Sequence, residues 1–204
     1  MINELQVGPQ KAADGGKPTA RGGNEGQTVA SDLHGRHYEA SKRGSIFVAQ
    51  AVVTAPVIYT TAAGTGGPFI WNGSSTVNVN LLKLGYALTT ASGVVGALGI
   101  TGGSSQNATP TSTTAIDSRA NLYIGGPASA ATPYRVATPA AAGTFLMPVL
   151  QIGTIATSVT EGLSWFDLDG IITIPPNSWA AVAASATLTS CVIQICLVYE
   201  EVLI

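Results

Sequence analysis

Short apolar runs separated by Gly, Pro, Asn and Ser make up the chain from Ser45 onward. No segment keeps a helical spacing of apolar residues for more than about two turns. Runs of this length between turn-forming residues are typical of β-strands. About eight to ten such runs without a crossover helix predict an all-β fold, an antiparallel β-sandwich or jelly roll, over residues 46–204.

The alternation of apolar and polar residues changes phase once within a single run. Val77, Val79 and Leu81 alternate with asparagines, and Leu82 and Leu84 then take over the apolar positions. Successive side chains of a strand point to opposite faces, so a change of phase needs one extra residue. We therefore expect a β-bulge near Leu81 and Leu82.

Turn-forming residues predict how other strands are connected. Asp169-Gly170 separates residues 165–168 from residues 171–174, which predicts a β-hairpin. Pro175-Pro176 is expected to end its second strand. Further strands are expected at residues 46–53, 56–61, 143–155 and, as the last pair, 179–188 and 191–202, with a turn at Asn72-Gly73 and loops at residues 64–68, 101–118 and 125–142.

Charge divides the chain into two parts. Residues 1–45 hold 11 of the 20 charged side chains and both histidines. Gly is frequent between residues 10 and 27, and a segment of this composition buries too little apolar area to fold alone. We therefore expect an extended polar N-terminal arm over residues 1–45 and one β-sandwich domain over residues 46–204.

The expected domain has few charges for its size. The whole chain is 46% hydrophobic and only 10% charged, whereas an ordinary domain is about 25% charged. Gly, Ala, Ser and Thr make up 92 of the 204 residues, and small side chains lose little conformational entropy when another protein covers them. We therefore expect much of this surface to meet protein.

Composition also disfavours several classes of partner. The net charge of −2 gives no basic excess for phosphates, so we expect no nucleic-acid partner. Residues 178–199 are long enough to cross a bilayer, but polar residues interrupt them, so we expect no membrane span. Residues 1–10 lack the basic and apolar regions of a signal peptide. Cys191 and Cys196 would point to opposite faces of one strand and so are not expected to bridge each other.

A cluster in the expected arm has the composition of a metal site. Asp32, His34 and His37 offer a carboxylate and two imidazoles. Gly35 disfavours the helix that would align them, and we see no further cluster of strong ligands elsewhere in the sequence. Polar contacts of the arm are therefore the preferred interpretation.

The acids of the expected domain are also explained without catalysis. Asp167 and Asp169 resemble part of a calcium loop, but apolar residues follow where oxygen ligands would be needed, and a hairpin turn explains them better. Glu161 with Asp167 offers a carboxylate pair for glycoside hydrolysis, although two acids this close in sequence are common. No nucleophile has a recognisable base near it. We therefore predict no enzymatic activity, no catalytic residue, no cofactor and no metal.

Three tryptophans leave two interpretations open. Trp71, Trp165 and Trp179 would suit a sugar-stacking platform. In a β-sandwich they are more often core residues or interface anchors, which is the interpretation we prefer.

Several stretches of the chain, taken together, resemble one group of proteins. They are residues 33–40, Arg43-Gly44, Phe47, Trp71-Asn72, 79–83, 175–178, 183–187 and 199–201. The chain resembles tailed-bacteriophage virion structural proteins of the capsid decoration or cement type, known mostly from genomic sequences. The resemblance implies a particle component with a jelly-roll-like fold and an N-terminal arm, and it carries no chemistry.

Resemblance and charge pattern together predict a non-enzymatic phage structural protein that decorates or cements the capsid. We expect it on the outer surface of the phage head, after synthesis in the host cytoplasm, with the major capsid protein and further copies of itself as partners. The β-sandwich would form a homo-oligomer, with a trimer as the expected form. The arm would bind neighbouring capsid subunits through the candidate interface residues Arg21, Arg36, His37, Tyr38, Lys42 and Arg43.

Two other functions remain as alternatives. The first is a component of the tail, the neck or a receptor-binding fibre, whose tryptophans and loops at residues 101–118 and 125–142 recognise a host glycan. The second is a secreted hydrolase or carbohydrate module, which the lack of a signal peptide and the few ionisable groups disfavour.

Overall fold

The computed structural model describes residues 37–54, 65–90, 94–104, 108–152, 164–186, 188 and 191–204. The chain divides into two compact units, Met1–Glu39 and Ala40–Ile204, and the fold described here is that of the second. This unit starts before the boundary expected at residue 45. The predicted arm up to residue 36 lies outside the described residues. A short helix, α1 (Tyr38–Lys42), spans the boundary between the units.

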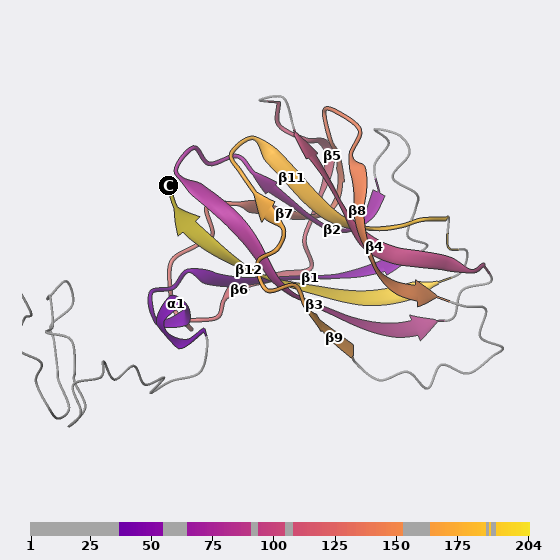
Figure 1. The fold of residues 1–204 in the computed structure, drawn as a ribbon, viewed down its shortest axis with the longest axis horizontal. Coiled ribbons are helices and arrows are strands. Elements are labelled where there is room, and N and C mark those ends of the chain that lie inside the picture. Colours follow the sequence, from indigo (N-terminus) through magenta and orange to yellow (C-terminus); the bar gives the residue numbers. More distant parts are fainter. Residues whose placement is uncertain are drawn as a thin grey trace, which may run out of the picture. The chain divides into compact units, whose positions relative to one another are not determined.

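The second unit is an all-β sandwich of two antiparallel sheets, which confirms the predicted fold class (Figure 1). The first sheet contains β1 (Ile46–Thr54), β3 (Val77–Thr90), β6 (Ser118–Asn121), β9 (Ser164–Asp167), β10 (Thr173–Ile174) and β12 (Val192–Leu203). The second contains β2 (Thr65–Asn72), β4 (Gly96–Ser104), β5 (Thr111–Ala115), β7 (Thr132–Thr138), β8 (Thr144–Ile152) and β11 (Ser178–Ala184).

Strands that follow one another in the chain often lie in opposite sheets. The first sheet has the order β10-β3-β12-β1-β6, with β9 also paired to β3, and the second has the order β5-β7-β2-β11-β4-β8. The strands β1 to β4 therefore alternate between the layers, as they do in jelly-roll-like sandwiches.

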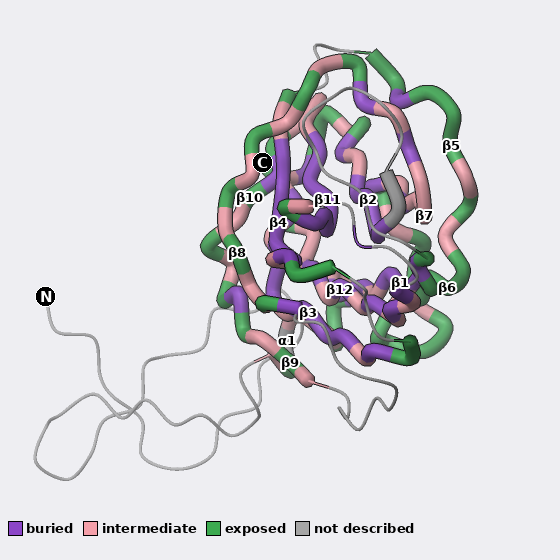
Figure 2. The backbone as a smooth tube through the Cα atoms, turned by 90° about the vertical axis from the view of Figure 1, so that its right-hand side faces the viewer, coloured by how far each residue is buried: buried purple, intermediate pink, exposed green. Residues whose placement is uncertain are grey.

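The main core lies between the two sheets and follows from alternation along each strand. Ile193, Ile195, Leu197 and Tyr199 of β12 are all buried, whereas the residues between them are half-buried. They pack with inward-facing residues of the second sheet such as Ile100. Figure 2 shows buried residues along β3, β12, β4 and β11, while β5 is mostly exposed.

A second apolar cluster lies on the other face of the second sheet. The rings of Phe69 and Trp179 stack with centroids 5.0 Å apart, and Tyr134 lies 6.4 Å from Phe69. Small side chains of β7 and β11, among them Ala137 and Ala181, fill the space beside the rings. This is why β11 is buried along nearly its whole length and has no polar face.

The predicted bulge is confirmed. Val198 of β12 lies opposite Lys83, and the next residue, Tyr199, lies opposite Leu81. Leu82 is therefore the extra residue, so both Leu81 and Leu82 are buried.

The predicted hairpin at Asp169-Gly170 is wrong. Leu168 accepts a hydrogen bond from the amide of Ile171 at 2.9 Å, so the turn itself exists. Both of its arms, β9 and β10, nevertheless pair with β3 instead of with each other. The 14 residues of β3 are long enough to accept both arms along one edge, and this pairing buries Leu168 and Ile174.

Other predicted connections are also wrong. The expected last pair is split, because β11 lies in the second sheet and β12 in the first. Residues 66–68 belong to β2. The loop expected at residues 101–118 contains the end of β4, all of β5 and the first residue of β6, and the loop expected at residues 125–142 contains β7. These segments are rich in Gly, Ala and Thr, so backbone pairing decides their structure and the apolar pattern does not reveal it. The strand expected at residues 56–61 lies outside the described residues.

Asn72 ties the two sheets together at the predicted Asn72-Gly73 turn. Its side chain is fully buried, and Nδ2 donates to the carbonyls of Val77 at 2.8 Å and Ile174 at 3.0 Å. Its Oδ1 accepts from the amide of Ser74. One amide group therefore joins the end of β2 to the ends of β3 and β10.

We expect Asn72→Ala to lower the free energy of unfolding by about 2–4 kcal/mol, because two buried carbonyls would lose their donor. The matched control is Asn78→Ala, a half-buried asparagine of β3, which should change it by no more than about 1 kcal/mol. Urea unfolding followed by circular dichroism measures both. Equal effects of the two substitutions would contradict the role assigned to Asn72.

Candidate functional site

A rigid apolar protrusion follows β6. Its residues are Leu122, Tyr123 and Ile124, called the finger below, and they are 46%, 51% and 96% exposed. The amide of Leu122 donates to the Ile46 carbonyl at 2.9 Å, and the amide of Gly126 donates to the Tyr123 carbonyl at 2.8 Å. The backbone of the finger is therefore held at both ends, while its side chains face solvent.

Asn121 fixes the base of the finger. Its Oδ1 accepts from the amide of Tyr123 at 2.8 Å. Its Nδ2 donates to the carbonyls of Gly44 at 2.7 Å and Pro127 at 2.9 Å. One side chain thus joins the segment before β1, the finger and the chain after the finger, residues 125–131, which is called the returning chain below.

The returning chain is held by a carboxylate from β12. Glu201 accepts hydrogen bonds from the Ser129 hydroxyl at 2.6 Å and from the amides of Ala130 at 3.1 Å and Ala131 at 2.9 Å. Bonds to an ionised acceptor are stronger than bonds between neutral groups. Glu201 therefore locks residues 129–131 onto the end of β12.

Tyr199 lies beneath this lock. Its hydroxyl contacts the Ser129 hydroxyl at 2.9 Å, and its ring stacks on Phe47 with centroids 5.6 Å apart. Burial raises the pKa of Tyr199 to about 12, and the negative charge of Glu201 adds to this. The hydrogen bond between the Tyr199 and Ser129 hydroxyls and the charge of Arg119 lower the pKa but do not outweigh burial.

A groove of about 370 Å³, called the loop groove below, lies beside the finger. Its lining residues are Phe47, Arg119, Ala120, Asn121, residues 124–129 and Tyr199. The Ser129 hydroxyl is bonded to a carboxylate that also holds two amides, and no histidine is among the described lining residues. This arrangement positions a loop and does not form a nucleophile with its base.

A second groove, called the end groove below, lies between β4, β8 and the chain after β11. It has a volume of about 490 Å³ and is lined by Val95, Gly96, Ala97, Pro148, Val149, Leu150, Gln151 and Ser185. None of these side chains is charged. Ala97 and Ser185 exchange hydrogen bonds that fix one wall: the Ala97 amide donates to the Ser185 hydroxyl at 2.8 Å, and the Ser185 amide donates to the Ala97 carbonyl at 2.7 Å.

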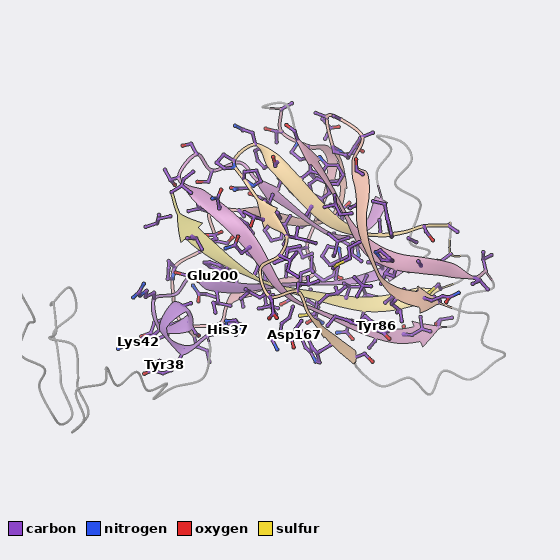
Figure 3. All side chains as sticks on the ribbon, viewed as in Figure 1. His37, Tyr38, Lys42, Tyr86, Asp167 and Glu200 are labelled. Atoms are coloured by element: carbon purple, nitrogen blue, oxygen red, sulfur yellow. The ribbon has the colours of Figure 1, made fainter. Side chains whose placement is uncertain are left out.

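The structure places four of the six predicted interface residues. His37 precedes α1 and is half-buried, whereas Tyr38 begins the helix and Lys42 ends it (Figure 3). Tyr38 and Lys42 are four residues apart and so lie on one face of the helix. Arg43 follows and is exposed. Arg21 and Arg36 lie outside the described residues.

The candidate metal and carboxylate sites are only partly described. Asp32, His34 and Glu161 lie outside the described residues. Within the parts of the chain that are described, no group of three or more His, Cys, Asp or Glu side chains could hold a metal ion. Asp167 forms an ion pair with Lys83 at 2.7 Å, and Asp169 adopts a positive φ of 50° in the turn between β9 and β10.

The three tryptophans have different environments. Trp179 is buried in the second cluster, and Trp71 packs partly against it. Trp165 is 48% exposed and covers Gly85, where an added Cβ would come within 2.9 Å of its ring. The three rings thus form no single platform.

Neither cysteine is bonded to the other. Burial raises the pKa of the Cys191 thiol to about 11, and it also raises the pKa of Cys196. Both thiols are therefore protonated near neutral pH, which makes them weak nucleophiles.

Sequence reasoning did not predict the finger, the end groove or the hydrogen bonds by which Glu201 holds residues 129–131. Leu122, Tyr123 and Ile124 stand directly before Gly125-Gly126-Pro127, and three apolar residues next to a turn signal are the one indication of a protrusion there. Nothing local marks Glu201, because its partners lie about 70 residues earlier in the chain.

The raised pKa of Tyr199 makes unfolding depend on alkaline pH. The hydroxyl ionises at its ordinary pKa of 10.0 in the unfolded chain and at about 12 in the folded chain. The contribution of Tyr199 to the free energy of unfolding is therefore present below about pH 10 and decreases by roughly 2 kcal/mol as the pH rises from 10 to 12. Tyr199→Phe removes this ionisation, so the difference in unfolding free energy between wild type and variant should change by that amount over this range. Urea titrations at each pH give the two unfolding free energies. A difference between wild type and variant that stays the same at every pH would refute the assignment.

Comparisons with known proteins provide no family for this chain. No family model, curated protein or solved structure matches it. Within the described residues, no helix is long and apolar enough to cross a bilayer.

Proposed function

We propose that this chain is a non-enzymatic structural protein of a tailed-bacteriophage particle that decorates or cements the capsid as a homo-oligomer. The single observation that supports this most is the finger, a firmly held apolar segment whose Ile124 is 96% exposed. Exposed apolar side chains on a rigid support are typical of contact sites between proteins. Val52, Val95 and Leu146 are also exposed on the sandwich.

The N-terminal arm has the second role in this proposal. Arg21, Arg36, Lys42 and Arg43 would pair with carboxylates of the major capsid protein, because guanidinium and ammonium groups form strong charge-assisted bonds with them. Lys42 and Arg43 are exposed where α1 leads into β1, which suits this role. The sandwich would then form the outer, oligomeric part of the decoration.

Removal of residues 1–30 should abolish binding to the capsid and leave the sandwich folded. The measurement is co-sedimentation with capsids of the encoding phage from which this protein has been removed, with circular dichroism to confirm the β-sheet signal. A second variant with Lys42→Gln and Arg43→Gln keeps the arm length and should bind more weakly than the full chain. Full occupancy by the truncated protein would show that the arm mechanism is wrong.

A second candidate function is glycan recognition by a tail, neck or fibre component. Trp165 favours it, because this ring packs over Gly85 and is about half exposed, and sugar rings stack on exposed aromatic rings.

We expect specific hits on a glycan array only if this second function applies, and Trp165→Ala should then remove them. Trp71→Ala is the matched control, since Trp71 is half-buried and packs against the second cluster. An array without hits would exclude the second function and leave the capsid role.

A further inference from the structure

The finger is an exposed apolar segment, and the end groove is an open hollow whose lining is more apolar than polar. The finger presents Leu122, Tyr123 and Ile124 outward. The end groove is open and uncharged, and Val95, Val149 and Leu150 are among its apolar lining residues. A volume of about 490 Å³ is large enough to take a branched apolar side chain together with part of its neighbours.

The two features lie at opposite ends of the sandwich. The finger is bonded to Ile46, which lies opposite Glu200 of β12, and Glu200 in turn lies opposite Asn80 of β3. The end groove begins at Val95, beyond the far end of β3 at Thr90. The ten residues of β3 between these points span roughly 33 Å at about 3.3 Å per residue. The finger of one chain therefore does not reach the end groove of the same chain.

We propose that the finger of one copy inserts into the end groove of a second copy. Each copy then offers one finger and one groove, so the contact is head-to-tail. Such contacts form a closed ring where the rotation between copies returns to the start, and an open chain otherwise. This inference specifies the contact that would build the oligomer of the proposed function, and it rests on that function only for its biological use.

Charge and rigidity both favour a second copy as the occupant. No lining residue of the end groove and no residue of the finger is charged, so no ion loses water when they meet. Asn121 and the backbone hydrogen bonds at both ends of the finger already hold it in place, so little conformational freedom is lost on insertion. A single chain supplies both halves of the contact, and no other partner has to be assumed.

The test uses the full chain and needs no capsid. Ile124→Asp changes the finger, and Val95→Asp changes a groove residue that is 49% exposed and outside the strands. Ile171→Asp is the matched control, because Ile171 is 78% exposed but belongs to neither feature. Circular dichroism and thermal unfolding should be the same for all three.

Sedimentation equilibrium should show an oligomer for the wild type and the control. Ile124→Asp and Val95→Asp should each raise the dissociation constant at least about 30-fold, as loss of a central anchor does. A monomeric wild type would overturn the proposal. Loss of association in Ile124→Asp but not in Val95→Asp would also overturn it, because the finger would then meet another surface.

Mixing the two variants gives a sharper result. Ile124→Asp keeps its groove and Val95→Asp keeps its finger, so the mixture should form a one-to-one pair and stop there. The pair has a changed finger at one end and a changed groove at the other. Absence of this pair would refute the head-to-tail contact, whereas failure of capsid binding alone would refute only the proposed function.

Discussion

The long antiparallel pairing of β3 with β12 is the interaction on which the rest of the second unit depends. It runs from Val77 opposite Leu203 to Thr90 opposite Val192. β1 adds to the other edge of β12, and β9 and β10 add to the other edge of β3. The first sheet is therefore assembled around one ladder, and the second sheet closes over its apolar face.

The end of β12 in this ladder also holds the loop that follows the finger. Because Leu82 is the extra residue, the register of β12 against β3 differs before and after it. Beyond the bulge, Tyr199 faces the core, where its hydroxyl meets Ser129. Glu201, two residues later and therefore on the same face, accepts the amides of residues 130 and 131. The regular alternation of β12 thus places the two side chains that hold a loop about 70 residues away in sequence.

The sequence predicted those elements whose own residues carry the signal. Alternation in β12 and the change of phase at Leu82 are local patterns, and the strand and the bulge that they predict are both confirmed. Which strand a given strand pairs with is not predicted in this way, because several sheet edges compete for it. Asp169-Gly170 does form a turn, yet its two arms pair with β3, which no local pattern reveals. The finger was not predicted for the same reason, since its supports Gly44 and Ile46 are distant in the chain.

The free edges of the sheets explain why contact through side chains is more plausible than strand addition. Beyond β6, the edge of β1 is blocked at Val52, whose amide donates to the Asp117 carboxylate at 2.7 Å, while Asp117 also pairs with Arg135. The edge strand β8 contains Pro148, which has no amide hydrogen, and two register shifts interrupt its pairing with β4. Such features prevent one sheet from continuing into another copy. A sandwich with few charges and partly blocked edges can still associate in an ordered way, provided that apolar side chains on a fixed support meet an apolar groove.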